Sequence, residues 1–186
     1  GPPVVLLHGL GASSLTWAAN IPALAAHHAV YAVDAPGHGD SGWAPPSGPP
    51  LELTPAVGAN VLGGFLDALA IEHTALAGSS MGGLVALRYA LDHPGRVTHL
   101  LLVDSAGLGR ETSWFLRLAS LPGLGRVLFA LPVGTPHMLG HRYFVAPERI
   151  DPALLRALQR ARTAQVAGSA MARATRLAGN LAGIRG

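Results

Sequence analysis

Four short apolar runs, each ended by a turn of glycine or polar residues, are the feature that most restricts the fold. The runs lie at residues 4–7, 29–33, 74–77 and 97–103. They have the length of strands and are bounded by turn residues, as buried strands are. Helical segments separate them, and this alternation is typical of a parallel sheet with helices on both faces. The sequence therefore predicts an α/β fold with a mostly parallel sheet.

The segments between these runs carry helix signals. Thr54 is a candidate N-cap with Pro55 at the first helical position, and apolar residues then recur at helical spacing as far as Leu69. We expect an amphipathic helix there, and shorter helices at about residues 17–26 and 84–91. Each of these helices connects two strands of the predicted sheet.

The pattern changes after Gly109. No further strand-like run follows, and the helical stretches are interrupted by prolines. We therefore predict two units, a partial α/β core over residues 1–109 and an inserted helical cap over residues 110–186.

Residues 78–82, with the sequence GSSMG, fit the pattern G-x-S-x-G at the junction of a predicted strand and a predicted helix. Small residues suit this place because the chain must reverse sharply. Free N–H groups and the helix dipole at the helix N-terminus favour a developing negative charge. The pattern indicates Ser80 as a nucleophile, and the alternative is a glycine-rich turn without chemistry.

A second glycine turn, with the sequence HGLG at residues 8–11, ends the first apolar run. The carboxyl ends of parallel strands lie at one edge of a sheet, where α/β folds place their sites. We therefore expect this turn and the one containing Ser80 to meet in space.

Four blocks, in this order, resemble the α/β-hydrolase family. They are HGLG at 8–11, DAPGHGDS at 34–41, GSSMGG at 78–83 and LVDSAG at 102–107. The chain is most similar to capped, cofactor-free members, such as meta-cleavage product C–C hydrolases, esterases and proline iminopeptidases. The resemblance implies a serine hydrolase that needs no cofactor, and nothing in the sequence suggests a metal site.

The resemblance also implies roles for individual residues. Ser80 would be the nucleophile, and the backbone N–H groups of Leu10 and Met81 would form the oxyanion hole. His8 would orient its turn rather than act as a base. A serine at position 80, rather than an aspartate, argues against the haloalkane dehalogenase and epoxide hydrolase branches.

The loop at residues 34–41 has two interpretations. It is either a wall of the active site or a structural turn packed on the preceding one. We favour the structural turn, and His38 belongs with it.

The family places its catalytic acid and histidine after the nucleophile, each following a later strand. No such strands are recognisable before Gly186, and those that usually precede the first block are absent. We therefore expect a fragment that is truncated at both ends and, as given, incomplete and inactive. Asp104 is a possible acid, although a structural residue that caps backbone N–H groups is the favoured alternative. His137 and His141 are more simply polar residues of the cap than a base.

The leading hypothesis is a hydrolase that acts on an ester or a diketone-type C–C bond of a small, largely apolar substrate. Two alternatives remain open, an acyltransferase of the same fold and a catalytically silent ligand-binding protein. Apolar residues of the predicted cap would line a pocket or merely pack: Trp114, Phe115, Leu118, Leu121, Phe129, Met138 and Phe144.

Charge and cysteine content limit the possible partners and compartment. Residues 110–186 hold eleven Arg and three acidic residues. These Arg lack the interleaved aromatic residues of single-strand-binding proteins, so we expect no nucleic-acid partner. No run is long enough to span a bilayer. The absence of cysteine fits a reducing compartment, and we expect a cytoplasmic protein of undetermined oligomeric state.

Overall fold

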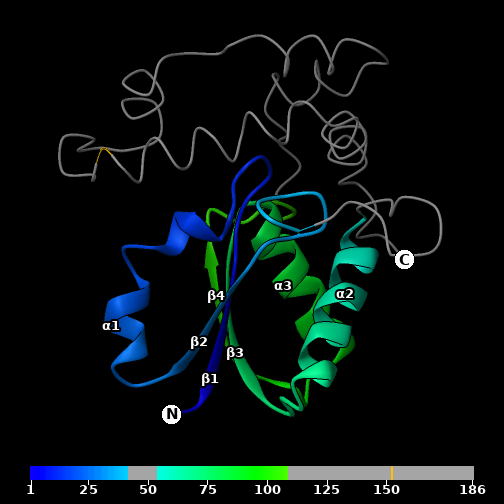
Figure 1. Ribbon diagram of the computed structural model, residues 1–186. Helices are drawn as coiled ribbons and strands as arrows, with labels where there is room; N and C mark the ends of the chain where they lie inside the picture. The colour runs from blue at the N-terminus through cyan, green and yellow to red at the C-terminus, as the bar shows by residue number, and fades with distance from the viewer. Residues whose placement is uncertain (42–53, 109–151, 153–186) are drawn as a thin grey trace, which may run out of the picture.

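The computed structural model of the chain describes residues 1–41, 54–108 and 152 (Figure 1). They form a four-stranded parallel sheet in the order β2-β1-β3-β4. The strands are β1 (Pro3–Leu7), β2 (Ala29–Val33), β3 (Thr74–Ser79) and β4 (Val97–Val103). The predicted α/β fold with a parallel sheet is confirmed.

The central strand β1 fixes the register of the sheet. Val5 pairs with Tyr31 of β2 on one side and with Leu76 of β3 on the other. All these strands run in one direction, so β1 and β3 end at the same edge of the sheet. The turns that follow them are therefore neighbours.

Helices cover both faces of the sheet. The 3₁₀-helix η1 (Ser14–Trp17) and α1 (Ile21–Ala25) lie on one face, and α2 (Pro55–Ala68) and α3 (Met81–Asp92) lie on the other (Figure 1). Thr54 caps α2 as predicted, because its hydroxyl accepts a hydrogen bond from the Val57 N–H at 3.1 Å.

Two of the predicted helices differ from those observed. The single helix expected at residues 17–26 is instead η1 followed by the short α1, because Pro22 has no N–H to donate to Ala18 and its ring would clash with that carbonyl. Helix α3 begins at Met81 rather than near residue 84. The first turn of α3 was not predicted, because it contains Gly82 and Gly83 and glycine is a poor helix former.

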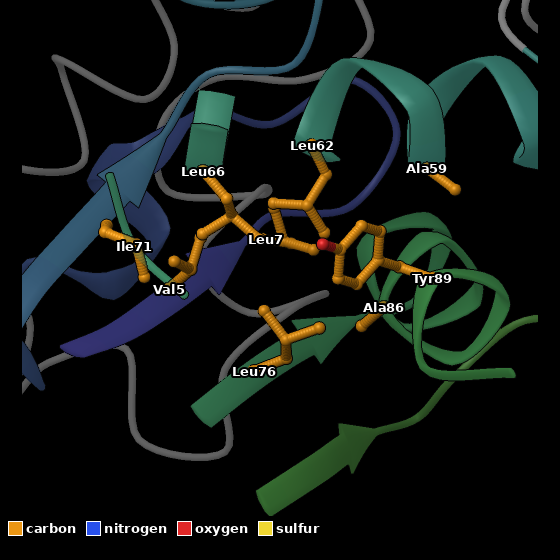
Figure 2. Close-up of a cluster of buried hydrophobic side chains, with 9 residues drawn as sticks. All are labelled: Val5, Leu7, Ala59, Leu62, Leu66, Ile71, Leu76, Ala86 and Tyr89. Atoms are coloured by element: carbon orange, nitrogen blue, oxygen red, sulfur yellow. The ribbon is translucent and has the colours of Figure 1, made fainter. Parts of the chain in front are cut away.

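Side chains alternate along β1 between two apolar clusters. Val5 and Leu7 face α2 and α3, whereas Val4 and Leu6 face Trp17. Figure 2 shows the larger cluster, in which Leu66 of α2 points toward the strand residues. Both faces of β1 are buried, as a central parallel strand requires.

β4 is the outer strand of the described sheet. Leu101 and Val103 are 59% and 43% exposed there. None of the helices within the described ranges has the length and apolar character needed to cross a bilayer. The cap predicted at residues 110–186 lies outside the described residues apart from Pro152, so it stays a prediction.

Candidate active site

Ser80 links β3 to α3 in a single residue. Its backbone has φ 51° and ψ −114°, a left-handed conformation that costs a non-glycine residue about 1–3 kcal/mol. Backbone hydrogen bonds hold it there. The Ser80 N–H donates to the Val103 carbonyl at 3.1 Å, and the Ser80 carbonyl accepts from the Ala106 N–H at 3.0 Å. The end of β4 thus supports the strained turn.

Close backbone packing explains the glycine that follows the serine by two positions. A Cβ atom on Gly82 would collide with the carbonyl oxygens of Leu7 and His8. The first turn of α3 therefore lies directly against the end of β1. A larger residue at position 82 would push the two elements apart.

The turn at residues 8–11 lies beside Ser80. A Cβ atom placed on Gly9 would stand 3.3 Å from the Ser80 Cβ and 3.9 Å from its Oγ. The two glycine turns therefore meet, as the sequence predicted. Any side chain on Gly9 would crowd the space next to the serine hydroxyl.

Two backbone donors are left free beside this contact. Leu10 and Met81 are half-buried, and within the described residues neither N–H has a hydrogen-bond acceptor. The Met81 N–H is free because the first N–H groups of a helix have no partner within the helix. Both free donors can receive a negatively charged oxygen.

His8 is fully engaged with backbone groups. Its Nδ1 lies 2.7 Å from the Gly9 carbonyl, to which it donates, and its Nε2 accepts from the Ala35 N–H at 3.0 Å. Burial lowers the pKa of His8. The hydrogen bond to Gly9 and the charge of Asp34 raise the pKa, but they offset burial only in part. The ring is neutral with both nitrogens occupied, which agrees with an orienting role.

The loop at residues 34–41 packs against that turn. The Asp34 carboxylate accepts hydrogen bonds from the Ser14 N–H at 2.6 Å and the Asp40 N–H at 3.0 Å. Burial raises the pKa of Asp34, but these two N–H groups, the Ser14 side chain and the nearby His8 together outweigh burial and hold the pKa below its ordinary value. These contacts fit the structural interpretation that the sequence favoured.

His38 belongs to the same packed loop. Its ring centroid lies 5.1 Å from that of His8, and only 2% of the residue is exposed. Burial lowers the pKa of His38 to about 4, and the neighbouring His8 adds to this effect. The His38 ring is therefore neutral at neutral pH.

Asp104 follows β4 with φ 47° and is exposed. Within residues 1–41, 54–108 and 152 the Asp104 carboxylate has no hydrogen-bond partner, so the expectation that it caps nearby N–H groups stays a prediction. The backbone of the turn, through Ala106, makes the contact to Ser80 instead. The role of Asp104 as a catalytic acid stays a prediction.

The base that would activate Ser80 is not found in the described ranges. No histidine ring there hydrogen-bonds to the Ser80 Oγ, and His137 and His141 lie outside the described residues. Apart from His8 and His38, the histidines in these ranges lie at the surface: His28 is half-buried, and His27, His73, His93 and His99 are exposed. No group of three or more metal-ligating side chains occurs in residues 1–41, 54–108 and 152.

A depression of about 400 Å³ lies at the opposite end of the sheet, where β3 and β4 begin. Arg96, which lines it, donates to the Asp67 carboxylate at 2.9 Å and to the carbonyls of Ile71 and Glu72 at 2.8 Å each. These contacts tie two loops together. The hydrogen bonds of Arg96 have a structural role. We therefore take the Ser80 site, rather than this depression, as the candidate active site.

The sequence is similar to known families and proteins. A family model described as "alpha/beta hydrolase fold" matches residues 2–129, which is more than half of the chain. One relative is the dihydrolipoyllysine-residue acetyltransferase component of an acetoin cleaving system of Pseudomonas putida, 48% identical over 109 residues. Another is the pimeloyl-[acyl-carrier protein] methyl ester esterase of Aeromonas hydrophila, 40% identical over 106 residues.

These similarities cover only part of each relative. The matches take in 59% and 57% of this chain, but 28% of the acetyltransferase component and 39% of the esterase. The chain thus spans well under half the length of these relatives.

Solved structures share the fold. A hydrolase from Pseudomonas aeruginosa is 29% identical with a TM-score of 0.64, and the match covers 96% of this chain and 63% of that one. An epoxide hydrolase, CorEH, has a TM-score of 0.77 over all of this chain and 67% of its own. Its 22% identity shows a common fold alone.

Proposed function

The chain belongs to the alpha/beta hydrolase fold family, and we propose from this that Ser80 is the nucleophile of a serine hydrolase. Its substrate would be an ester or a diketone-type C–C bond in a small, largely apolar molecule. The observation that carries the proposal is the contact between Ser80, in a strained strand–helix turn, and Gly9. This contact supports a site in which the Ser80 hydroxyl would lie near the N–H donors of Leu10 and Met81.

The arrangement suits acyl transfer through a covalent intermediate. For an ester, the Ser80 Oγ forms a bond to the acyl carbon while a base takes its proton, and the carbonyl oxygen becomes negative. The N–H groups of Leu10 and Met81 would stabilise that oxygen. The C–O bond to the leaving alcohol then breaks, the alcohol takes the proton, and water releases the acid. The base and its acid partner would come from other parts of the whole protein.

The relatives' names support ester chemistry more than epoxide opening. A methyl ester esterase is 40% identical, whereas the similarity to an epoxide hydrolase is one of fold. A serine hydroxyl at position 80 also suits acyl transfer. The small apolar substrate rests on the cap proposed for residues 110–186.

The direct test is Ser80→Ala in the whole protein, assayed with p-nitrophenyl esters of short acids. We expect turnover to fall on the order of 10⁴-fold or more, as it does when a nucleophile is removed. The matched control is Ser79→Ala at the neighbouring half-buried serine, which should retain turnover. Retained turnover in the folded Ser80→Ala variant would rule out the assignment.

Acyltransferase activity is a second candidate, because one relative's name describes an acetyltransferase component and another, 38% identical, is a 1-acylglycerol-3-phosphate O-acyltransferase of Arabidopsis thaliana. Both activities would use the same Ser80 intermediate and differ in what attacks it. The ratio of transferred to hydrolysed acyl groups, measured with an added alcohol or thiol, separates them. A protein that binds the ester and returns it unchanged would instead be a silent binding protein.

A further inference from the structure

The turn that contains Leu10 is hydrogen-bonded at both ends to the loop at residues 34–41. At its start, His8 Nε2 accepts a hydrogen bond from the Ala35 N–H at 3.0 Å. At its far end, the Ser14 N–H donates to Asp34 Oδ1 at 2.6 Å. Leu10 lies between these two ties, so the position of its N–H depends on residues 34 and 35.

Asp34 is itself held in place on several sides. Its Oδ2 accepts from the Asp40 N–H at 3.0 Å, and its carbonyl accepts from the Ser41 hydroxyl at 2.8 Å. Gly39 lies so close that a Cβ atom there would collide with the carboxylate. These contacts hold the carboxylate in place beside the Ser14 N–H.

From this geometry we infer that Asp34 and His8 are positioning residues, which fix the Leu10 N–H relative to Ser80. The inference rests on the proposed function, since it concerns the oxyanion donor of that site. Neither residue touches the reacting atoms in this account. Both act through the backbone of the turn, whose Gly9 packs against the serine.

The distinctive consequence is a loss of turnover without a loss of substrate binding. An oxyanion donor acts mainly in the transition state, so displacing it lowers kcat more than it raises KM. A displacement of about 1 Å can cost on the order of 10²-fold in rate. A residue that only stabilised the fold would change the amount of active protein and its melting temperature, but not this ratio.

Ser14→Pro is the sharpest variant, because it removes both groups of Ser14 that hydrogen-bond to the Asp34 carboxylate, the backbone N–H and the side-chain hydroxyl. Position 14 is the first residue of η1, where proline is tolerated, and Ser13 before it is extended, as a residue before proline should be. Asp34→Asn is the companion variant, since an amide oxygen is a weaker acceptor than a carboxylate. The matched control is Asp40→Asn, which removes an exposed carboxylate from the same loop.

In the whole protein we expect Ser14→Pro and Asp34→Asn each to lower kcat for a p-nitrophenyl ester about 10- to 100-fold. KM should stay within about threefold of the wild-type value, because the contacts that bind the substrate in its ground state are not changed. The kcat of the double variant should be little lower than that of either single variant, since both substitutions weaken the same interaction between Ser14 and Asp34. Asp40→Asn should match the wild type.

An unchanged kcat in folded Asp34→Asn would overturn the inference, even if Ser14→Pro failed to fold. Parallel rises in KM with constant kcat would do the same. The result of Ser80→Ala distinguishes this failure from that of the proposed function. If Ser80→Ala abolishes turnover while Asp34→Asn retains it, only the positioning role is wrong.

Discussion

At the scale of single residues, the site depends on backbone groups more than on side chains. Ser80 supplies a hydroxyl, whereas the proposed donors at Leu10 and Met81 are N–H groups that any residue could provide. The sequence could predict the sharp turn at Ser80, because close packing requires the glycines around it. It could not reveal the link between Asp34 and Ser14, because a hydrogen bond to a distant backbone N–H leaves no pattern in the sequence.

The buried His38 predicts how stability depends on pH. Its folded pKa of about 4 lies below the ordinary 6.5, so the unfolded chain binds more protons between these values. Stability should therefore fall as pH drops from 6.5 toward 4. The loss from His38 at pH 4.5 should be about 2 kcal/mol relative to pH 7.

Urea unfolding at pH 7 and pH 4.5 measures this difference. His38→Asn should reduce it, while His27→Asn, at an exposed ring, should leave it unchanged. The neighbouring groups act in the same direction. Burial also lowers the pKa of His8, and the N–H groups around Asp34 hold its pKa below 3.8, so its own effect comes at lower pH. Equal stability at both pH values would contradict the burial of these rings.

At the scale of helices and strands, α2 is held by one apolar face. Leu66 is fully buried in the cluster of Figure 2, whereas Leu69 is 46% exposed one turn later. We expect Leu66→Ala to lower the free energy of unfolding by about 2–5 kcal/mol, through lost burial and a cavity. Leu69→Ala should cost less than about 1 kcal/mol. Similar losses in urea unfolding for the two variants would contradict the observed packing of α2.

Strands were easier to predict than helix boundaries. The runs at residues 29–33 and 97–103 match β2 and β4, because both have the length of strands and end at turn residues. The single helix predicted at residues 17–26 is interrupted before Pro22 in the structure, since the spacing of apolar residues does not show where helical hydrogen bonding is interrupted. The start of α3 was missed because tertiary packing overrides the low helix propensity of Gly82 and Gly83.

At the scale of the whole molecule, the described residues hold the nucleophile side of the proposed site. Ser80, the proposed oxyanion donors at Leu10 and Met81, and the loop at residues 34–41 all lie within residues 1–41 and 54–108. The sequence could predict that the two glycine turns lie at one edge of the sheet, because the direction of the strands alone determines where their ends lie. The proposed base, the acid partner and the cap require other parts of the protein, so substrate and reaction remain proposals.

Covalent labelling of the whole protein with a phosphonofluoridate would show directly whether Ser80 is the nucleophile. The Ser80 Oγ would displace fluoride from phosphorus, its proton passing to the base, and leave a stable phosphonate ester. Peptide mass spectrometry should then find one phosphonate on the peptide that contains Ser80, and none in Ser80→Ala. A label on a different residue, or no label in a protein that still hydrolyses esters, would contradict the account.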